Sequence, residues 1–167
     1  MDELSAHTQV DPAARKAVLR MFTYGLYAVG VARGDDRNMF TANWLTQASF
    51  EPPLITLSVE NDSHSIDLIR ETGVFTVSVF GDDQKEQAAA LGKRWHLRPD
   101  KLKDMSHKIG VTGCPYLADS LGYLECAIVD SMRAGDSTLL LAEIVNAEVL
   151  REGTPLTMAA AGFRHAG

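Results

Sequence analysis

The sequence predicts a mainly β fold: an antiparallel barrel of six or seven strands with short helices at its periphery. Strand-like runs succeed one another along the chain and are joined by tight turns, which is typical of antiparallel pairing. No strand–helix–strand unit repeats, so a parallel sheet is not indicated. The chain has 167 residues, 46% of them apolar and 23% charged, which suffices for one packed core. We expect a single domain over residues 1–167, with residues 1–10 as a loose N-terminal arm.

The first elements are a short helix and a hairpin. Asp11 is a favourable N-cap residue and is followed by proline, which favours the first helical position, so a helix is predicted up to Met21. The stretches 24–33 and 38–44 are rich in apolar and aromatic residues and flank a turn signal at residues 34–36. They are therefore expected to pair as a β-hairpin.

The central part of the chain alternates between strands and a helix. Residues 46–50 are expected to be a connector, and the two prolines that follow impose an extended entry into a strand over 54–59. The apolar residues of 63–71 fall on one side at helical spacing, and a glycine follows that stretch. Residues 74–80 form a further predicted strand.

The remaining elements complete the sheet. A helix is predicted over 82–91, since its first turn is acidic and a glycine follows it. Residues 93–108 are basic and irregular, and a connector of this length is often a lid or an excursion from the core. Two long strand-like runs, 121–132 and 138–149, flank a hairpin loop over 133–137.

Charge and cysteine content exclude several classes of protein. The chain has 16 basic and 22 acidic residues, a net charge of −6, which argues against a nucleic-acid-binding protein. Two cysteines, Cys114 and Cys126, exclude a disulfide-rich scaffold, and we expect both to be buried thiols. The polar N-terminus lacks the apolar stretch of a signal peptide, and no stretch reaches the ~20 apolar residues of a membrane span. A soluble, cytoplasmic protein without membrane contacts is predicted.

Common catalytic and metal-binding motifs are missing. Neither glycine-rich nucleotide motif occurs, and there is no nucleophile elbow. The five histidines lie far apart without ligand spacing, so no metal site is predicted. The acidic pairs at 35–36 and 82–83 stand at a turn and a helix start, where local capping explains them.

Two polar clusters remain between residues 38 and 65. Small polar residues surround Trp44, and exposed backbone with short polar side chains suits a flat polar ligand; these residues are Thr41, Ala42, Asn43, Thr46, Gln47, Ala48 and Ser49. The second cluster, residues 60–65, opens the predicted helix and could hold an anion on free first-turn N–H groups. Plain N-capping by Asp62 or Ser63 is the alternative, and the periodicity alone favours it.

Three segments in order resemble the flavin reductase-like family, whose fold is the FMN-binding split β-barrel. They are T-A-N-W-x-x-x-x-S-x-x-P-P-L from Thr41, S-V-x-x-x-S-x-S-x-x-L-I from Ser58, and V-F-T-V-S-V-F from Val74. Residues 122–126, 134–136 and 142–145 agree with the same family. The similarity covers about residues 22–163.

This resemblance implies a homodimer that holds a flavin, FMN or alternatively FAD, in a groove near the dimer interface. It places residues 41–44 along the flavin ring and ribityl chain. It implies that Gln47, Ala48 and Ser49 form hydrogen bonds with the ring edge or the ribityl hydroxyls. It also implies that the phosphate is contacted by Asn61, Ser63, His64 and Ser65. No catalytic side chain is assigned, because in such proteins the cofactor carries the chemistry. Trp44 either packs on the flavin or belongs to the core or dimer interface. Trp95 and His96 either cover the flavin or pack on the surface.

The sequence departs from the family pattern at two places. The family often has a lysine and an arginine in the phosphate loop, where this chain has Asn61 and His64. The helix N-terminus and a protonated His64 would have to compensate, so flavin binding is expected to weaken with rising pH if His64 contributes. Many NAD(P)H-using members also read G-D-H-T in the late hairpin, where this chain has Ser137.

The sequence therefore leaves three functions open. The first is an NAD(P)H:flavin oxidoreductase that passes reduced flavin to a monooxygenase or another acceptor. The second is a flavoredoxin-like FMN electron carrier that exchanges electrons with protein partners without oxidising NAD(P)H, which Ser137 favours. The third is a non-catalytic barrel that binds another planar ligand. Flavin retention and NAD(P)H oxidation separate the three.

Overall fold

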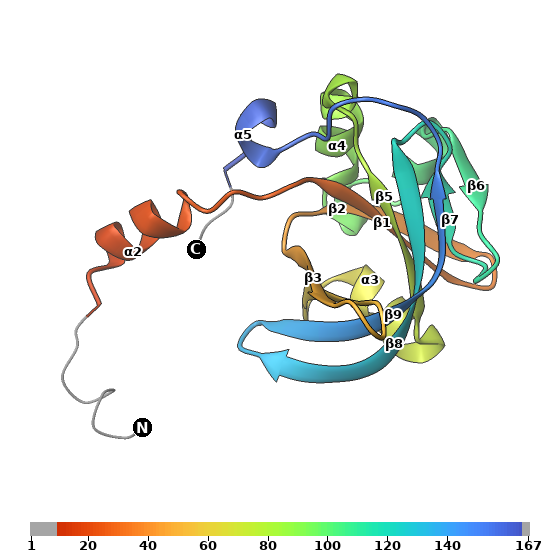
Figure 1. Cartoon of the computed structure of the whole chain (residues 1–167), viewed down its shortest axis with the longest axis horizontal. Coiled ribbons are helices and arrows are strands. Elements are labelled where there is room, and N and C mark those ends of the chain that lie inside the picture. Colours follow the sequence, from red (N-terminus) through yellow and green to blue (C-terminus); the bar gives the residue numbers. More distant parts are fainter. Residues whose placement is uncertain (1–9, 165–167) are drawn as a thin grey trace.

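A computed structural model describes residues 10–164. The expected loose arm covers residues 1–10, and its residues 1–9 lie outside this described range. The central feature is an antiparallel sheet of seven strands in the order β2-β1-β5-β8-β9-β4-β3 (Figure 1). Its strands are β1 (Tyr27–Arg33), β2 (Asp36–Ala42), β3 (Leu45–Ser49), β4 (Leu54–Glu60), β5 (Val74–Val79), β8 (Gly122–Ala134) and β9 (Ser137–Val149).

The sheet curls into a barrel that is split between its two edge strands. β2 and β3 stand at opposite ends of the strand order, yet only Asn43 and Trp44 separate them in the chain. At this corner the Ser58 N–H donates to the Trp44 carbonyl at 3.0 Å, which binds the corner to β4. The predicted mainly β fold with a split antiparallel barrel is confirmed.

Short helices surround the barrel. They are the α-helices α2 (Pro12–Leu19), α3 (His64–Thr72), α4 (Lys85–Leu91) and α5 (Met158–Ala161), and the 3-10 helices η1 (Asp82–Gln84), η2 (Trp95–Leu97) and η3 (Lys101–Asp104). α3 begins as the local sequence predicts, because Ser63 Oγ accepts from the Ile66 N–H at 3.3 Å. It ends at Gly73, whose φ of 71° suits glycine.

Two stretches differ from the sequence prediction. Residues 46–50, expected to be a connector, lie mostly within β3, because pairing with β4 gives this exposed polar segment its hydrogen bonds. The predicted irregular segment 93–108 contains η2, η3 and the first residues of β6 (His107–Ile109). β6 pairs with β7 (Pro115–Leu117) in a separate two-stranded sheet.

Two apolar clusters occupy opposite faces of β1. Val29 and Val31 point into the barrel, where they pack with residues of α3 and β4. Ala28 points outward and joins Leu91, the last residue of α4, and Leu156, which precedes α5. This alternation along one strand places a core on each side of the sheet. β2, hydrogen-bonded to β1 at the edge of the sheet, therefore runs between both cores.

α2 lies apart from the barrel (Figure 1). None of its residues is buried, and Val18, Met21 and Phe22 at its C-terminal end are exposed. Within residues 10–164, none of the helices is long and apolar enough to cross a membrane.

Candidate functional site

A cavity of about 580 Å³ lies along β2 and is walled by elements from both cores. This volume falls within the range of about 300–1,000 Å³ that is typical of small-molecule sites. One wall comes from Asn38 and residues 40–44, together with the end of β4 and Ser65 of α3. Opposite these, α4 and residues 92–95 line the cavity, and Lys101, Met158 and Phe163 complete it.

Five of the residues predicted from the sequence line this cavity: Thr41, Ala42, Asn43, Trp44 and Ser65. Thr41 and Asn43 also tie the walls together. The Thr41 hydroxyl donates to the Ala88 carbonyl at 2.7 Å, and the Asn43 amide donates to the Met158 sulfur at 2.9 Å. These contacts hold α4 and α5 against β2.

The three predicted residues on β3 do not line the cavity. Gln47 and Ala48 are exposed and Ser49 is half-buried. The Gln47 side chain donates to the Ser49 carbonyl at 3.4 Å. These residues belong to the outer edge of the sheet, beyond the corner at Asn43 and Trp44.

Asn61 and Ser63 also lie outside the cavity wall, and each serves a local purpose. Asn61 Oδ1 accepts from Arg70 at 3.0 Å and from the Thr138 hydroxyl at 2.6 Å, which binds the loop after β4 to β9. Ser63 caps α3. The capping explanation considered from the sequence thus accounts for the contacts of Ser63, while Asn61 serves to join two strands.

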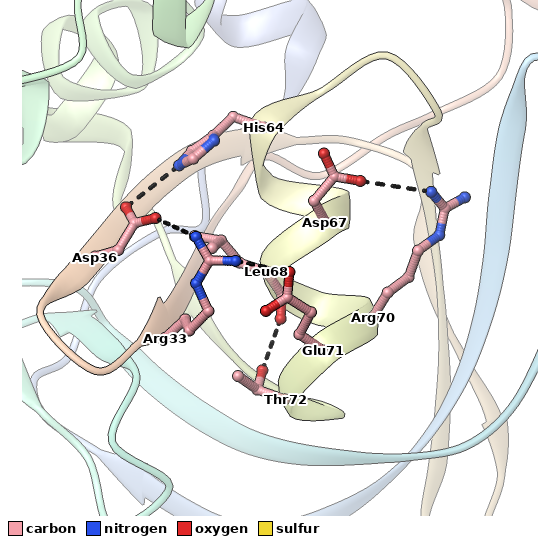
Figure 2. A network of polar contacts seen from close by, with 8 residues as sticks. All are labelled: Arg33, Asp36, His64, Asp67, Leu68, Arg70, Glu71 and Thr72. Atoms are coloured by element: carbon pink, nitrogen blue, oxygen red, sulfur yellow. Dashed lines mark hydrogen bonds and ion pairs between the residues drawn. The ribbon is translucent and has the colours of Figure 1, made fainter.

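His64 is tied to the β1–β2 hairpin and to the connector after α4. Its Nε2 lies 3.3 Å from Asp36 Oδ1, and Asp36 also pairs with Arg33 at 3.2 Å (Figure 2). Arg33 in turn contacts Glu71 at 2.6 Å, so both ends of α3 are fixed to the hairpin. On its other side, the His64 ring stacks on Trp95, with centroids 4.2 Å apart and planes inclined by 24°.

The segment after α4 covers one side of the cavity. Trp95 and Arg94 line it, and Arg94 pairs with Asp62 of the loop after β4 at 3.3 Å. With the His64 stack, this pair holds residues 94–95 against the start of α3. Trp95, for which the sequence left lid and surface packing open, thus forms part of the cavity wall, whereas the exposed His96 does not line it.

Lys101 is a buried cavity residue that the sequence did not single out. Its side chain is 2% exposed, and its ammonium donates to the carbonyls of Leu91 and Lys93, both at 2.7 Å. Burial lowers the pKa of Lys101 to about 8. The sequence feature that could have pointed to Lys101 is the basic stretch 93–108. The sequence alone, however, does not distinguish a buried lysine from lysines exposed to solvent.

Asn38 is a second cavity residue that the sequence did not single out. It is 2% exposed, and its Nδ2 donates to Ser65 Oγ at 2.9 Å. Its place at the start of the polar stretch 38–65 was the available signal.

The walls combine apolar and aromatic surface with charge. Phe40, Trp44 and Trp95 contribute aromatic rings. Three cations (Lys93, Arg94, Lys101) and one acid (Glu60) line the cavity, although the whole chain carries −6. This arrangement suits a planar ligand that carries a negative group. Within the described part of the chain, no group of three or more His, Cys, Asp or Glu side chains could hold a metal ion.

Fold and cavity together define a split-barrel protein whose cavity is lined by aromatic rings and basic side chains. The model of the flavin reductase like domain matches residues 19–167. The chain therefore belongs to the flavin reductase-like family, as its sequence motifs indicated.

Known proteins of this family resemble the chain over most of its length. The NADH-dependent flavin reductase of a Rhodococcus species is 29% identical over 159 residues, which are 93% of this chain and 87% of that protein. The flavin reductase component of a bacterial two-component tryptophan halogenase is 30% identical, with a TM-score of 0.80 over 90% of this chain and 95% of that one. The NADH:FAD oxidoreductase of Streptomyces globisporus, in complex with NAD and FAD fragments, is 27% identical, with a TM-score of 0.81. The match covers 96% of this chain and 97% of that one.

Other relatives are longer proteins. The high molecular weight rubredoxin of Moorella thermoacetica is 30% identical over 143 residues, and the match spans 84% of this chain but 62% of that protein. A diflavin flavoprotein of Synechocystis matches over 25% of its length. The same domain thus occurs within larger proteins.

Proposed function

We propose that this protein is an NAD(P)H:flavin oxidoreductase that binds FMN, with FAD as the alternative flavin. The observation that carries the proposal is the cavity along β2, where aromatic walls meet three cations in a member of the flavin reductase-like family. The names of two relatives that match nearly the whole chain support NADH as the hydride donor.

The residues of the cavity fit a flavin. Phe40, Trp44 and Trp95 offer flat apolar surface for the ring system, and the buried Asn38 and Ser65 offer polar atoms to its edge or ribityl chain. A bound flavin supplies the hydride and electron chemistry. The protein binds and orients the ring, and the segment 92–95 excludes water from one side of it. We propose no catalytic side chain and no metal.

The individual contacts form part of the same proposal. Residues 41–44 and Ser65 contact the ring and ribityl chain, and the rim residues Asn61, Ser63 and His64 lie on the phosphate side. Gln47, Ala48 and Ser49 on the exposed edge of β3 do not line the cavity. In a dimer, these residues supply hydrogen bonds to the flavin. Lys93 provides positive charge that the loop after β4 lacks.

A homodimer in the cytoplasm is proposed as the working form. Exposed apolar side chains on the β8–β9 hairpin (Val129, Met132, Val145) and after α2 (Met21, Phe22) support a partner surface. Both cysteines are free and buried, which agrees with a reducing compartment. The two-component halogenase relative supports a monooxygenase-type enzyme as the acceptor of reduced flavin.

An FMN electron carrier that does not oxidise NAD(P)H is the second candidate. Ser137, which stands where many NAD(P)H-using members have a histidine, is 3% exposed and donates to Asp136 at 3.1 Å. This difference favours the carrier, but the names of two relatives that match nearly the whole chain favour the reductase.

A visible absorption spectrum of the purified, desalted full chain tests the proposal, with and without added FMN and then with NADH or NADPH under anaerobic conditions. Flavin bands that either nucleotide bleaches are expected. Bands that only dithionite bleaches would establish the electron carrier. If no flavin binds under any condition, the cavity takes another planar ligand and the proposal is wrong.

A further inference from the structure

Asn38, which lines the cavity, has a buried side-chain oxygen without a hydrogen-bond partner among the described residues. Asn38 Oδ1 makes no hydrogen bond to any of the described residues, although its side chain is 2% exposed. Most buried polar atoms in folded proteins are paired, so such an atom indicates a bound ligand or water that completes it. Within residues 10–164, two other buried side-chain atoms share this property, Arg37 Nε and Gln84 Nε2. Neither of those residues lines the cavity along β2.

The amide of Asn38 is held in place from the side opposite the free oxygen. Its Nδ2 donates to Ser65 Oγ at 2.9 Å, and Ser65 lies in the first turn of α3 and is itself buried. The ends of α3 are in turn fixed to the β1–β2 hairpin by His64 and Glu71 (Figure 2). Asn38, Phe40 and Ala42 share one face of β2 because side chains alternate along a strand, and all three line the cavity. The acceptor is therefore preorganised on a rigid wall.

Two of the cavity's own cations have other partners. The Lys101 ammonium donates to two main-chain carbonyls, and the Arg94 guanidinium pairs with Asp62 and lies 4.0 Å from Glu60. Each of these contacts holds the segment after α4 in position. Because none of the described residues donates to Asn38 Oδ1, a donor is expected from the ligand.

We infer that Asn38 is a specificity-determining residue that accepts a hydrogen bond from an N–H or O–H group of the bound flavin. The inference rests on the proposed function and assigns a contact within the same site. Two groups of a flavin have this chemistry: the ring N3–H and the ribityl hydroxyls. Ser65 acts as a positioning residue, since it touches Asn38 and fixes the plane of the amide.

Dissociation constants of three flavins test the inference in the full chain. Riboflavin carries both donors, 3-methylriboflavin lacks the ring N3–H, and lumiflavin lacks the ribityl chain. Quenching of flavin fluorescence gives each constant without any turnover. The wild-type protein is expected to bind one of the two modified flavins about ten- to a hundredfold more weakly than riboflavin, which is the cost of leaving one buried acceptor unpaired. The flavin that loses affinity identifies the donor group.

The affinity ratio is the dissociation constant of a modified flavin divided by that of riboflavin. The substitution Asn38→Leu, with a side chain of similar size, is expected to bring this ratio close to one for the flavin that loses affinity. Because the ratio is taken within a single variant, a general loss of stability or affinity does not mimic this result. Asn38→Asp keeps an oxygen at the same place and is expected to keep the ratio, with the Ser65 hydroxyl now donating to the carboxylate. Ser65→Ala is expected to reduce the ratio by a smaller factor.

Several outcomes overturn the inference. If both affinity ratios of Asn38→Leu equal those of the wild type, water rather than ligand completes Asn38. If Asn38→Asp loses the discrimination while folded, the group that faces the ligand is the amide nitrogen and not Oδ1. If the wild-type protein binds none of the three flavins, the proposed function fails as well, whereas flavin binding with unchanged ratios leaves that function intact.

Discussion

The imidazole of His64 stacks on the indole of Trp95, although 30 residues of chain separate them. The stack joins the first turn of α3 to η2, whose Trp95 lines the cavity, and the ion pair of Arg94 with Asp62 lies next to it in the chain. Together these contacts close one side of the proposed flavin site. The strength of this closure should therefore determine how fast a ligand leaves.

Replacing Trp95 with alanine should speed flavin release. An aromatic pair contributes about 0.5–1.5 kcal/mol, so the dissociation rate is expected to rise roughly two- to tenfold. Stopped-flow fluorescence after displacement of the bound flavin measures this rate. Trp95→Phe retains a ring and should stay near the wild-type rate. An unchanged rate in a folded Trp95→Ala protein would show that the segment after α4 does not restrain the ligand.

A bulky side chain on α4 should block the cavity without unfolding the protein. Ala89 is exposed and lines the cavity, so Ala89→Trp is expected to weaken flavin binding roughly tenfold or more. Because the position is on the surface, stability should change by about 0.5 kcal/mol or less. Ala160→Trp, an exposed position on α5 outside the cavity wall, is the matched control for added bulk. Equal flavin affinities of the two variants in equilibrium titrations would place the ligand elsewhere.

Lys101 should make stability depend on alkaline pH. Its pKa falls from an ordinary value of 10.5 to about 8 because the folded protein buries the ammonium. The unfolded chain then binds more protons between these two values, so folding stability rises with pH across this window. Relative to Lys101→Met, the wild-type unfolding free energy is expected to increase by up to about 3 kcal/mol. Urea unfolding of both proteins at pH 7.5 and pH 10 measures the difference. A decrease over this range would contradict the assignment.

Glu125 should stabilise the fold at neutral pH and lose this effect in acid. Burial of its carboxylate raises its pKa, but hydrogen bonds from Thr112, Asn146 and the N–H groups of Thr112 and Val111 outweigh burial and lower it overall. Because the pKa of Glu125 is lower in the folded than in the unfolded protein, its carboxylate stabilises the fold at pH values above the unfolded-state pKa of about 4.3. This stabilisation is lost as the pH falls through the folded-state pKa.

Glu125→Gln is therefore expected to lose about 2–3 kcal/mol at pH 7, because an amide replaces the acceptor of several donors. The gap from the wild type should narrow below about pH 4, in the range where the wild-type carboxylate takes up its proton. Thermal or urea unfolding against pH measures the gap, and Glu152→Gln at an exposed position serves as the control. A gap that is constant with pH would mean that the charge of Glu125 does not matter.

The elements with strong local signals were predictable. α3 has a serine cap and a terminal glycine, and the β8–β9 hairpin has long apolar strands around a turn. β3 was missed because its polar residues acquire strand structure only by pairing with β4. β6 and β7 were missed because each has three residues, too few for a periodic pattern.

The residues of the candidate site also divide into those that the sequence predicts and those that it does not. Residues 41–44 stand out in the sequence because small polar residues are unusual in a strand beside a tryptophan, and they line the cavity. Asn38 and Lys101 carry no such pattern. Asn38 meets Ser65 from 27 positions away, and Lys101 reaches back 10 positions to the end of α4.

The amino-acid sequence by itself determined the split-barrel class, the family and the polar stretch on which a ligand site could form. Periodicity, caps and turns act between near neighbours, so they are legible along the chain. Only the tertiary structure decided which polar atoms are buried, which cations line the cavity and that Asn38 Oδ1 has no partner within residues 10–164. Burial and pairing depend on segments far apart in the chain, and in a low-dielectric interior they decide what a polar atom does.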